Sequence, residues 1–242
     1  MTDGASTTSD SGTTGGPAAT DLPARDLVDV RLAAAIQLGG CAICAVRARS
    51  ERATLDAIIA ERVLDVGFRE GLEREHGFCR RHSADLLEAN REASGILGSS
   101  MLFGAIVERR LATLREAFQV KGRGRRQRLA AATERPPCIA CNQGASAVEI
   151  STARLLERSA DPAWVAAMRE IPFCLDDLTT LLVAAGDQAS FAPIAEHHLD
   201  RLEGLRARLA GYADHSAQDR RHLMTDEERT AADEAARLLA GD

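Results

Sequence analysis

The chain has 242 residues and a net charge of −6 at pH 7; 45% of its residues are hydrophobic, 27% are charged and only 3% are aromatic. The acidic balance excludes a protein built along its whole length to coat nucleic acid, and no apolar run approaches the roughly 20 residues that span a bilayer. Ala, Leu, Arg and Glu dominate the composition, which favours helices over sheets. We therefore expect an all-α globular protein.

Residues 1–22 are rich in Ser, Thr, Gly and Asp and lack helical periodicity, which predicts a disordered tail. The segment has neither the basic start nor the apolar stretch of a secretory signal. We therefore expect a cytoplasmic protein with no membrane partner. Disulfides rarely persist in the cytoplasm, so the six cysteines of the chain indicate metal binding or redox chemistry.

Residues 23–120 are predicted to form a first helical repeat. Apolar residues at helical spacing indicate a helix that ends at Gly39–Gly40, a long helix over about 42–64 and a short helix after it. A further helix is expected to begin at Cys79, and a long one to cover about 94–118.

Residues 121–136 include the run KGRGRRQR, whose glycines and charges predict a basic linker. An anion-binding or nucleic-acid-binding patch is the alternative, which we disfavour because no aromatic residue is interleaved with the charges. A second helical repeat is predicted over 137–212. A C-terminal helical segment follows over 213–242, where Thr225 and Glu228 have the spacing of a capping box.

The two halves of the chain resemble one another in order and spacing. GCAIC corresponds to PCIAC, HGFCRRHSADLL to IPFCLDDLTTLL, and FGAIVERRLATL to FAPIAEHHLDRL. Three matching segments in the same order predict two tandem, pseudo-symmetric helical repeats. Each repeat contains a CxxC pair and, about 35 residues later, a cysteine followed three positions on by His or Asp.

All six cysteines belong to these segments, and the order of the repeats predicts two metal sites. The first site is expected to contain Cys41, Cys44, Cys79 and His82, and the second Cys138, Cys141, Cys174 and Asp177. Groups at positions i and i+3 lie on one helix face, and helix N-termini favour thiolates. Two such pairs supply the four ligands of tetrahedral Zn²⁺. Buried cysteines in an apolar core are the alternative.

The fourth ligand of the second site is less well specified by the sequence. Asp177 occupies the position of His82, but an acidic residue also suits the first turn of a helix. Asp176 and the doublet His197–His198 are alternative ligands. We expect His76 to be exposed. We also expect solvated side chains at His215 and His222.

Three classes of function remain open. The first is a non-enzymatic, zinc-stabilised helical scaffold or interaction module with an unknown protein partner. The second is an iron–sulfur protein, although the cysteine spacings do not match the compact ferredoxin run. The third is thiol redox chemistry, although no βαβ pattern surrounds either CxxC. Enzymatic activity is disfavoured because GxSxG, P-loop, GxGxxG and HExxH motifs are absent from the sequence.

The tandem CxxC…GFCxxH pairing, followed by a capped helix that ends in LLAG, resembles an uncharacterised bacterial family of helical proteins with CPxC and GFCxxH motifs. The resemblance covers about 27–241. It implies the helical architecture and a metal site at the matching cysteines and histidine, and it implies no particular activity. The chain departs from that pattern at Ala42 and Ile139, where proline is usual, and at Asp177, where a second histidine would be expected.

Overall fold

The computed structural model describes residues 22–93, 95–132 and 138–241, and within these residues it contains helices and no strand. The predicted all-α class is confirmed. The expected N-terminal tail, apart from its last residue, lies outside the described residues. So do residues 133–137, which immediately precede the second CxxC pair.

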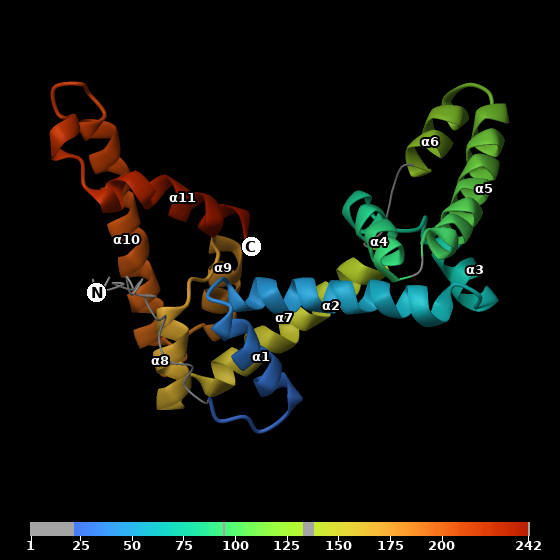
Figure 1. Cartoon of the computed structure of the whole chain (residues 1–242). Helices are drawn as coiled ribbons and strands as arrows, with labels where there is room; N and C mark the ends of the chain where they lie inside the picture. Colours follow the sequence, from blue (N-terminus) through green and yellow to red (C-terminus); the bar gives the residue numbers. More distant parts are fainter. Residues whose placement is uncertain (1–21, 94, 133–137, 242) are drawn as a thin grey trace, which may run out of the picture.

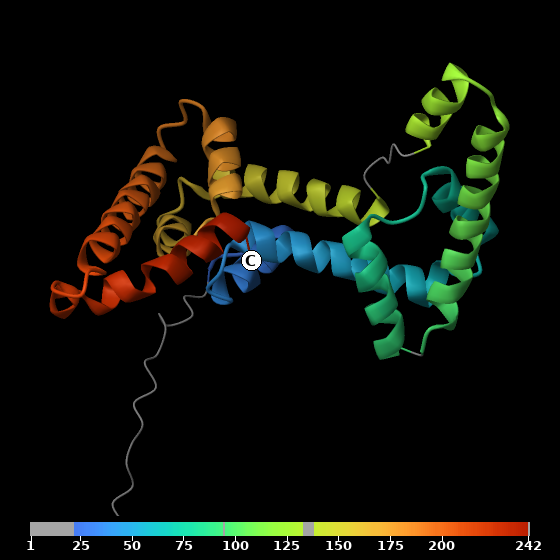
Figure 2. The same ribbon diagram turned by 90° about the horizontal axis from the view of Figure 1, so that it is seen from above.

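Two long helices form the centre of the molecule. Helix α2 (Ala42–Ala57) continues through the π-helical turn η1 (Ile58–Arg62), and α7 (Ile139–Arg158) packs against it along much of its length. The two helices run side by side in opposite directions (Figures 1 and 2). At 1.5 Å per residue, each is about 30 Å long. The start of each helix therefore lies near the far end of the other.

A helical lobe surrounds each end of this central pair (Figure 1). One lobe contains the start of α2 and the end of α7. It also contains α1 (Leu27–Gln37), α8 (Pro162–Glu170), α9 (Leu175–Ala185), α10 (Ala192–His215) and α11 (Asp226–Ala240). Its core is formed by buried side chains that include Leu32, Trp164 and Leu181. This lobe also holds the C-terminal end of the chain.

The other lobe contains the end of α2, the start of α7 and α3 (Val66–Arg74), α4 (Arg80–Ala93), α5 (Leu97–Gln119) and α6 (Arg123–Ala131). A separate core fills it, with Leu55, Leu86 and Leu102 almost completely buried. The two cores do not follow the two halves of the sequence, because α2 and α7 each contribute to both lobes.

A buried ion-pair network attaches α1 to α7. Asp29 is completely buried, and its carboxylate accepts hydrogen bonds from Arg154 (3.0 Å) and Arg158. The Arg158 guanidinium lies over the ring of Trp164, 5.5 Å from its centroid. A buried carboxylate is tolerated only when it is paired in this way, so this network fixes the position of α1 beside the central pair.

Helix α6 occupies much of the segment for which we expected a linker, and it packs against α5. The predicted capping box of α11 is confirmed: the Thr225 hydroxyl accepts from the Glu228 amide, and the Glu228 carboxylate accepts from the Thr225 amide. In the described part of the chain no single helix is long and apolar enough to cross a membrane. Helix α1 and the continuous α2–η1 helix together have the length and apolar composition of a membrane span, but a bend of 114° separates them.

Candidate metal centres

The cysteines lie at helix N-termini. Cys41, Cys138 and Cys174 are the N-cap residues of α2, α7 and α9, and Cys79 directly precedes α4. The first amides of a helix have no intrahelical acceptor. Those of His82 and Asp177 point at the sulfur atoms of Cys79 (3.5 Å) and Cys174 (3.4 Å). Each cysteine is therefore placed where backbone dipoles favour a thiolate.

The eight candidate ligands form two groups, in each of which the ligand atoms all lie within 4.8 Å of one another. The His82 cluster consists of Cys79, His82, Cys138 and Cys141. The Asp177 cluster consists of Cys41, Cys44, Cys174 and Asp177. Each cluster combines the CxxC pair of one sequence half with a pair from the other half, in which a cysteine is followed three positions later by His82 or Asp177.

The grouping expected from the order of the repeats is therefore wrong. Cys44 and Cys79 were expected in one site, but the helix of about 30 Å that begins at Cys41 carries the chain away from it. Helix α3 has only nine residues, too few to return over that distance. The antiparallel α7 begins where α4 begins, so the CxxC pair of the second half completes the site at Cys79. By the same geometry, α2 delivers its own CxxC pair to α9.

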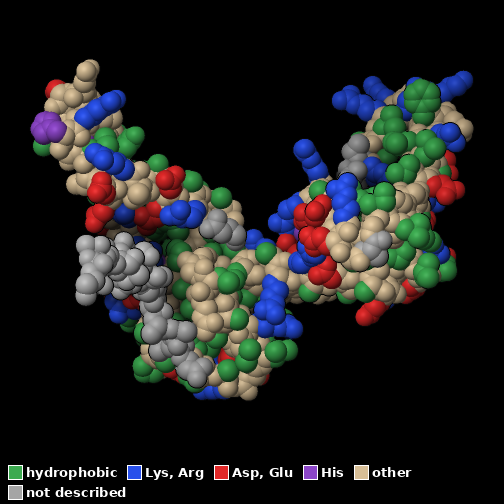
Figure 3. Space-filling view, viewed as in Figure 1, with side chains coloured by type: hydrophobic (Ala, Val, Ile, Leu, Met, Phe, Trp, Pro, Cys, Tyr) green, Lys and Arg blue, Asp and Glu red, His purple; other side chains and the backbone are tan. Residues whose placement is uncertain are grey.

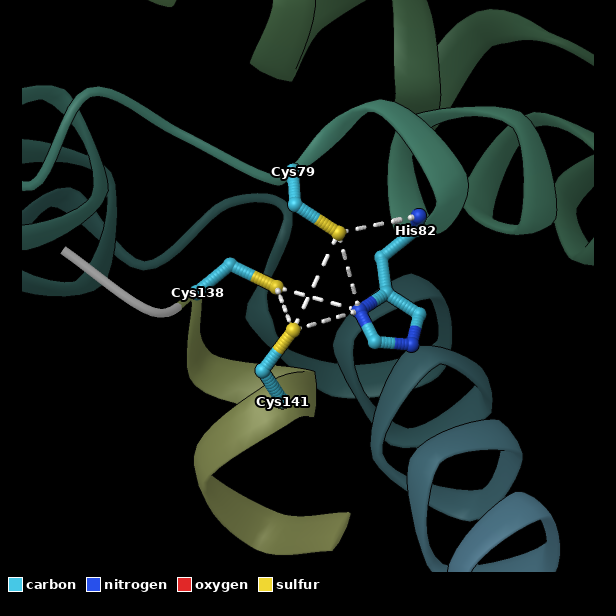
Figure 4. Close-up of side chains that lie close together, drawn as sticks. All are labelled: Cys79, His82, Cys138 and Cys141. Carbon is cyan, nitrogen blue, oxygen red and sulfur yellow. Dashed lines mark hydrogen bonds between the residues drawn. The ribbon is translucent and has the colours of Figure 1, made fainter. Parts of the chain in front are cut away.

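The His82 cluster has the dimensions of a tetrahedral ion site (Figure 4). The His82 Nδ1 lies 3.1 Å from the sulfur of Cys138 and 3.3 Å from those of Cys79 and Cys141. The sulfur atoms of Cys138 and Cys141 are 3.6 Å apart, and those of Cys141 and Cys79 are 3.8 Å apart. A zinc ion with bonds of about 2.3 Å to sulfur requires sulfur–sulfur separations of about 3.8 Å.

The Asp177 cluster has a similar size, with a carboxylate oxygen in place of the imidazole nitrogen. The Asp177 Oδ2 lies 3.0 Å from the sulfur of Cys44 and 3.2 Å from those of Cys41 and Cys174. The sulfur atoms of Cys44 and Cys174 are 3.6 Å apart. All four residues are buried. The carboxylate of Asp177, rather than one of the alternative ligands, therefore faces the sulfur atoms.

The alternative ligands lie elsewhere. Asp176 is exposed. His198 is buried against α8, where its Nε2 lies 2.9 Å from the Met168 carbonyl oxygen and its ring packs edge-on to Phe173. Burial lowers the pKa of His198 to about 4, so its imidazole stays neutral and the Nε2–H donates to that carbonyl.

The histidines expected to be exposed or solvated differ in their surroundings. His222 is exposed, as expected, and His76 is half-buried. The expectation for His215 is wrong, because its Nδ1 lies 3.0 Å from the Glu228 carboxylate. Gly211 makes this contact possible, since a Cβ atom there would collide with the Glu228 side chain.

Two charged residues of α2 each contact the non-cysteine ligand of one cluster. Glu51 is buried, and its Oε2 lies 3.3 Å from the His82 Nε2, while Arg81 forms an ion pair with the same carboxylate. The Arg47 guanidinium donates to the Asp177 Oδ1 at 3.1 Å. The His82 Nε2 lies 2.8 Å from a nitrogen of the Arg81 guanidinium, which can only donate, and 3.3 Å from the Glu51 carboxylate oxygen. A metal on Nδ1 would put the ring proton on Nε2, where Glu51 is the acceptor within reach. A metal-binding histidine usually has this kind of carboxylate partner.

A glycine makes room for Glu51. Gly144 lies three positions after Cys141, the second cysteine of its CxxC pair. Arg47 lies at the equivalent position, three residues after Cys44. A Cβ atom at Gly144 would lie 2.8 Å from the Glu51 Cγ. None of Glu51, Arg47 and Gly144 was predicted to support a cluster. Their roles depend on how α2 crosses α7, and the only sequence signal is the exchange of Arg for Gly at equivalent repeat positions.

Without a cation, the thiols of Cys44, Cys141 and Cys174 resist ionisation. Burial and the neighbouring Asp177 carboxylate raise the pKa of Cys44 to about 12, and burial with the adjacent thiols raises that of Cys141 to about 12. The pKa of Cys174 is also raised, by its contact with Cys41 and by burial. Cys138 differs: burial raises its pKa, but hydrogen bonds from the Cys79 and Cys141 amides outweigh this and lower it to about 7. A cation would be needed to hold all the thiolates of either cluster together.

Comparison of the chain with protein-family models, with curated proteins and with solved structures gives no match. The chemistry of the two clusters therefore rests on their own geometry.

Proposed function

We propose that the protein is a non-enzymatic helical scaffold, or interaction module, stabilised by two zinc ions. The observation that carries this proposal is the geometry of the two clusters: four donor atoms within 4.8 Å, three of them cysteine sulfurs at helix N-termini. The sulfur–sulfur separations of 3.6 to 3.8 Å are close to the edge of a tetrahedron of sulfur atoms around one zinc ion. All four donors come from the chain, which is the pattern of structural rather than catalytic zinc sites.

The position of the clusters explains what the ions would do. One ion would join the start of α7 to the start of α4, and the other the start of α2 to the start of α9. Each ion would therefore fasten one end of the central helix pair to a helix from the other half of the chain. Because few aromatic residues anchor the cores, metal binding would contribute directly to the free energy of folding.

Charge favours these assignments. Three thiolates, a neutral imidazole and Zn²⁺ give a net charge of about −1, and three thiolates, a carboxylate and Zn²⁺ give about −2. The site with the greater negative charge is the one where Arg47 binds the carboxylate. The site with the imidazole is the one where the Glu51 carboxylate lies 3.3 Å from the ring. Each supporting side chain thus has the sign that its ligand requires.

The iron–sulfur alternative is less well supported by these distances. A cluster separates its cysteine ligands by several iron and sulfide atoms, whereas the donor atoms here lie close enough to share one ion. Thiol redox chemistry is compatible with the 3.6 Å separation of the Cys44 and Cys174 sulfur atoms. We therefore keep it as the second candidate, in the form of a zinc site that responds to oxidation. Either role suits a reducing cytoplasm.

The test is to purify the full chain without added metal and to measure elemental content, the absorption spectrum and free thiols. Zinc at two ions per chain with no visible absorption is the expected result. A brown protein that absorbs visible light and contains iron and sulfide would contradict the zinc proposal. A folded, metal-free protein in which Cys44 and Cys174 oxidise reversibly would instead support thiol chemistry.

A further inference from the structure

The hairpin of α5 and α6 extends away from the central helix pair at one end of the molecule (Figures 1 and 2). Helix α5 contacts α3 and α4 through its first half, and α6 folds back along its second half. The metal clusters and their supporting side chains lie outside this hairpin, so its surface has no part in the proposed metal binding.

A stripe of large apolar side chains is exposed on the second half of α5. We call it the α5 stripe; it consists of Val107, Leu111, Leu114 and Phe118, of which Val107 and Phe118 are both 63% exposed. The residues are spaced by four, three and four positions. This spacing puts them on one side of the helix in the pattern by which one helix packs along another. The stripe covers about 16 Å, or three turns.

The same hairpin is strongly basic, although the whole chain is acidic. Residues 109–128 contain eight Lys or Arg residues and a single acidic one, Glu116. None of the eight cations forms an ion pair with the described residues. Arg125 of α6 lies over the exposed Phe118 ring, 4.5 Å from its centroid. Figure 3 shows Lys and Arg side chains gathered with hydrophobic ones at the outer end of this lobe.

Charge and shape together restrict what can cover this surface. A second copy of the same hairpin would bring unpaired arginines against one another, which is unfavourable. A polyanion such as nucleic acid would satisfy the cations but leave the α5 stripe in water. The helical spacing of the stripe fits another helix, and the flanking cations require that helix to be acidic.

We propose that the α5–α6 hairpin docks an amphipathic helix of a partner protein, one with an apolar face for the α5 stripe and Asp or Glu on either side of it. This gives a chemical identity to the partner of the proposed interaction module and rests on that role, but not on which metal the clusters hold. Affinity would come from covering the stripe, and specificity and association rate from the arginines.

The experiment is a titration of the metal-loaded full chain, labelled with ¹⁵N, with a capped synthetic peptide of about 21 residues, or three heptads. The peptide has Leu at heptad positions a and d and Glu at e and g. One control peptide replaces those Glu residues with Lys, and a second keeps the composition but scrambles the order so that no apolar face forms. We expect shifts on α5 and α6 with the first peptide only, weakened by added salt. Metal content measured on the same sample separates failure of docking from failure of the proposed metal binding.

Two pairs of matched variants complete the test. Leu114→Ser and Phe118→Ser remove apolar contacts, and Leu199→Ser and Val183→Ser change similarly exposed residues of the other lobe. We expect the first pair to weaken binding about tenfold or more and the second to leave it unchanged. Equal binding of the scrambled peptide would overturn the proposal. Binding to DNA, or to phosphatidylcholine vesicles with phosphatidylserine at roughly one part in four, would also overturn it if that binding were tighter than binding to the first peptide and unchanged in the Leu114→Ser and Phe118→Ser variants.

Discussion

The carboxylate of Glu51 lies 3.3 Å from the Nε2 of His82, while the Nδ1 of the same ring faces three cysteine sulfur atoms. Glu51 belongs to α2, whose own CxxC pair contributes to the other cluster. One helix therefore supplies two ligands to the Asp177 cluster and an orienting carboxylate to the His82 cluster. This couples the two proposed ion sites through a single rigid element.

Replacement of Glu51 by Ala should weaken metal binding at the His82 cluster. Loss of a carboxylate that orients a histidine ligand costs about 10- to 100-fold in metal affinity, and binding at the Asp177 cluster should stay within about twofold of the wild type. Competition with a chromogenic chelator measures both sites. Glu61→Ala, an exposed residue of the same continuous helix, is the control. Equal affinities of the Glu51 and Glu61 variants would show that His82 does not depend on Glu51.

Replacement of Gly144 by Ala should have a similar but smaller effect, because the new Cβ atom would meet the Glu51 side chain at 2.5–2.9 Å and displace it. Gly204→Ala is the matched control: Gly204 lies in the middle of α10 with open space around its Cβ position. That change should raise helix stability by about 0.5–1 kcal/mol. Thermal unfolding and chelator competition are measured together, and a stabilised Gly144→Ala protein with unchanged metal affinity would contradict the packing described.

Replacement of Arg47 by Ala should affect the other cluster. Asp177 would lose the guanidinium that binds its Oδ1, and the uncompensated negative charge should lower metal affinity there about tenfold or more. Arg49→Ala tests for a general effect of charge, because Arg49 is exposed on the same helix. The measurement is again chelator competition, site by site. A loss confined to the His82 cluster would be incompatible with the structure.

Metal loading should release protons. In the metal-free chain the pKa values of Cys44 and Cys141 are about 12, so both thiols are protonated at pH 7. An ion that binds their thiolates must displace at least one proton at each cluster. Affinity should therefore rise with pH and fall as the medium becomes acidic. A pH indicator in weakly buffered solution detects the release, with Mg²⁺ as a cation that does not favour thiolates. Zinc binding without proton release would contradict these pKa values.

The helical class and the eight cluster residues could be predicted from the sequence because each is a local pattern. Helical periodicity and the repeated Cys-containing segments are visible without knowledge of tertiary contacts. The grouping of the residues was not predicted correctly, although the predicted helix over 42–64 contained the necessary information. A helix of that length separates Cys44 from Cys79 by more than a metal site can span, so the partners of each pair had to come from the other half.

The supporting residues could not be predicted in the same way. Glu51 lies seven positions after Cys44, on the same helix, yet it serves the cluster that contains His82. Only the crossing of α2 and α7 brings it there. His215 was misjudged for a similar reason, because its partner Glu228 lies on the next helix, α11. In both cases a polar side chain takes its role from a tertiary contact that the local sequence pattern does not encode.

The exchange of ligand pairs between the two halves of the chain is the central claim, and two complementary quadruple variants test it directly. Cys41→Ser, Cys44→Ser, Cys174→Ser and Asp177→Asn together remove one cluster and leave the other complete. Cys41→Ser, Cys44→Ser, Cys79→Ser and His82→Ala together remove half of each cluster. The measurement is the cobalt stoichiometry of each variant from its visible absorption, with circular dichroism recorded on the same samples.

The structure predicts one tightly bound cobalt per chain in the first quadruple variant, with the spectrum of a tetrahedral site of three sulfurs and one nitrogen, and none in the second. The opposite result, with no cobalt in the first variant and one per chain in the second, would mean that each half of the chain builds its own site and would contradict the account.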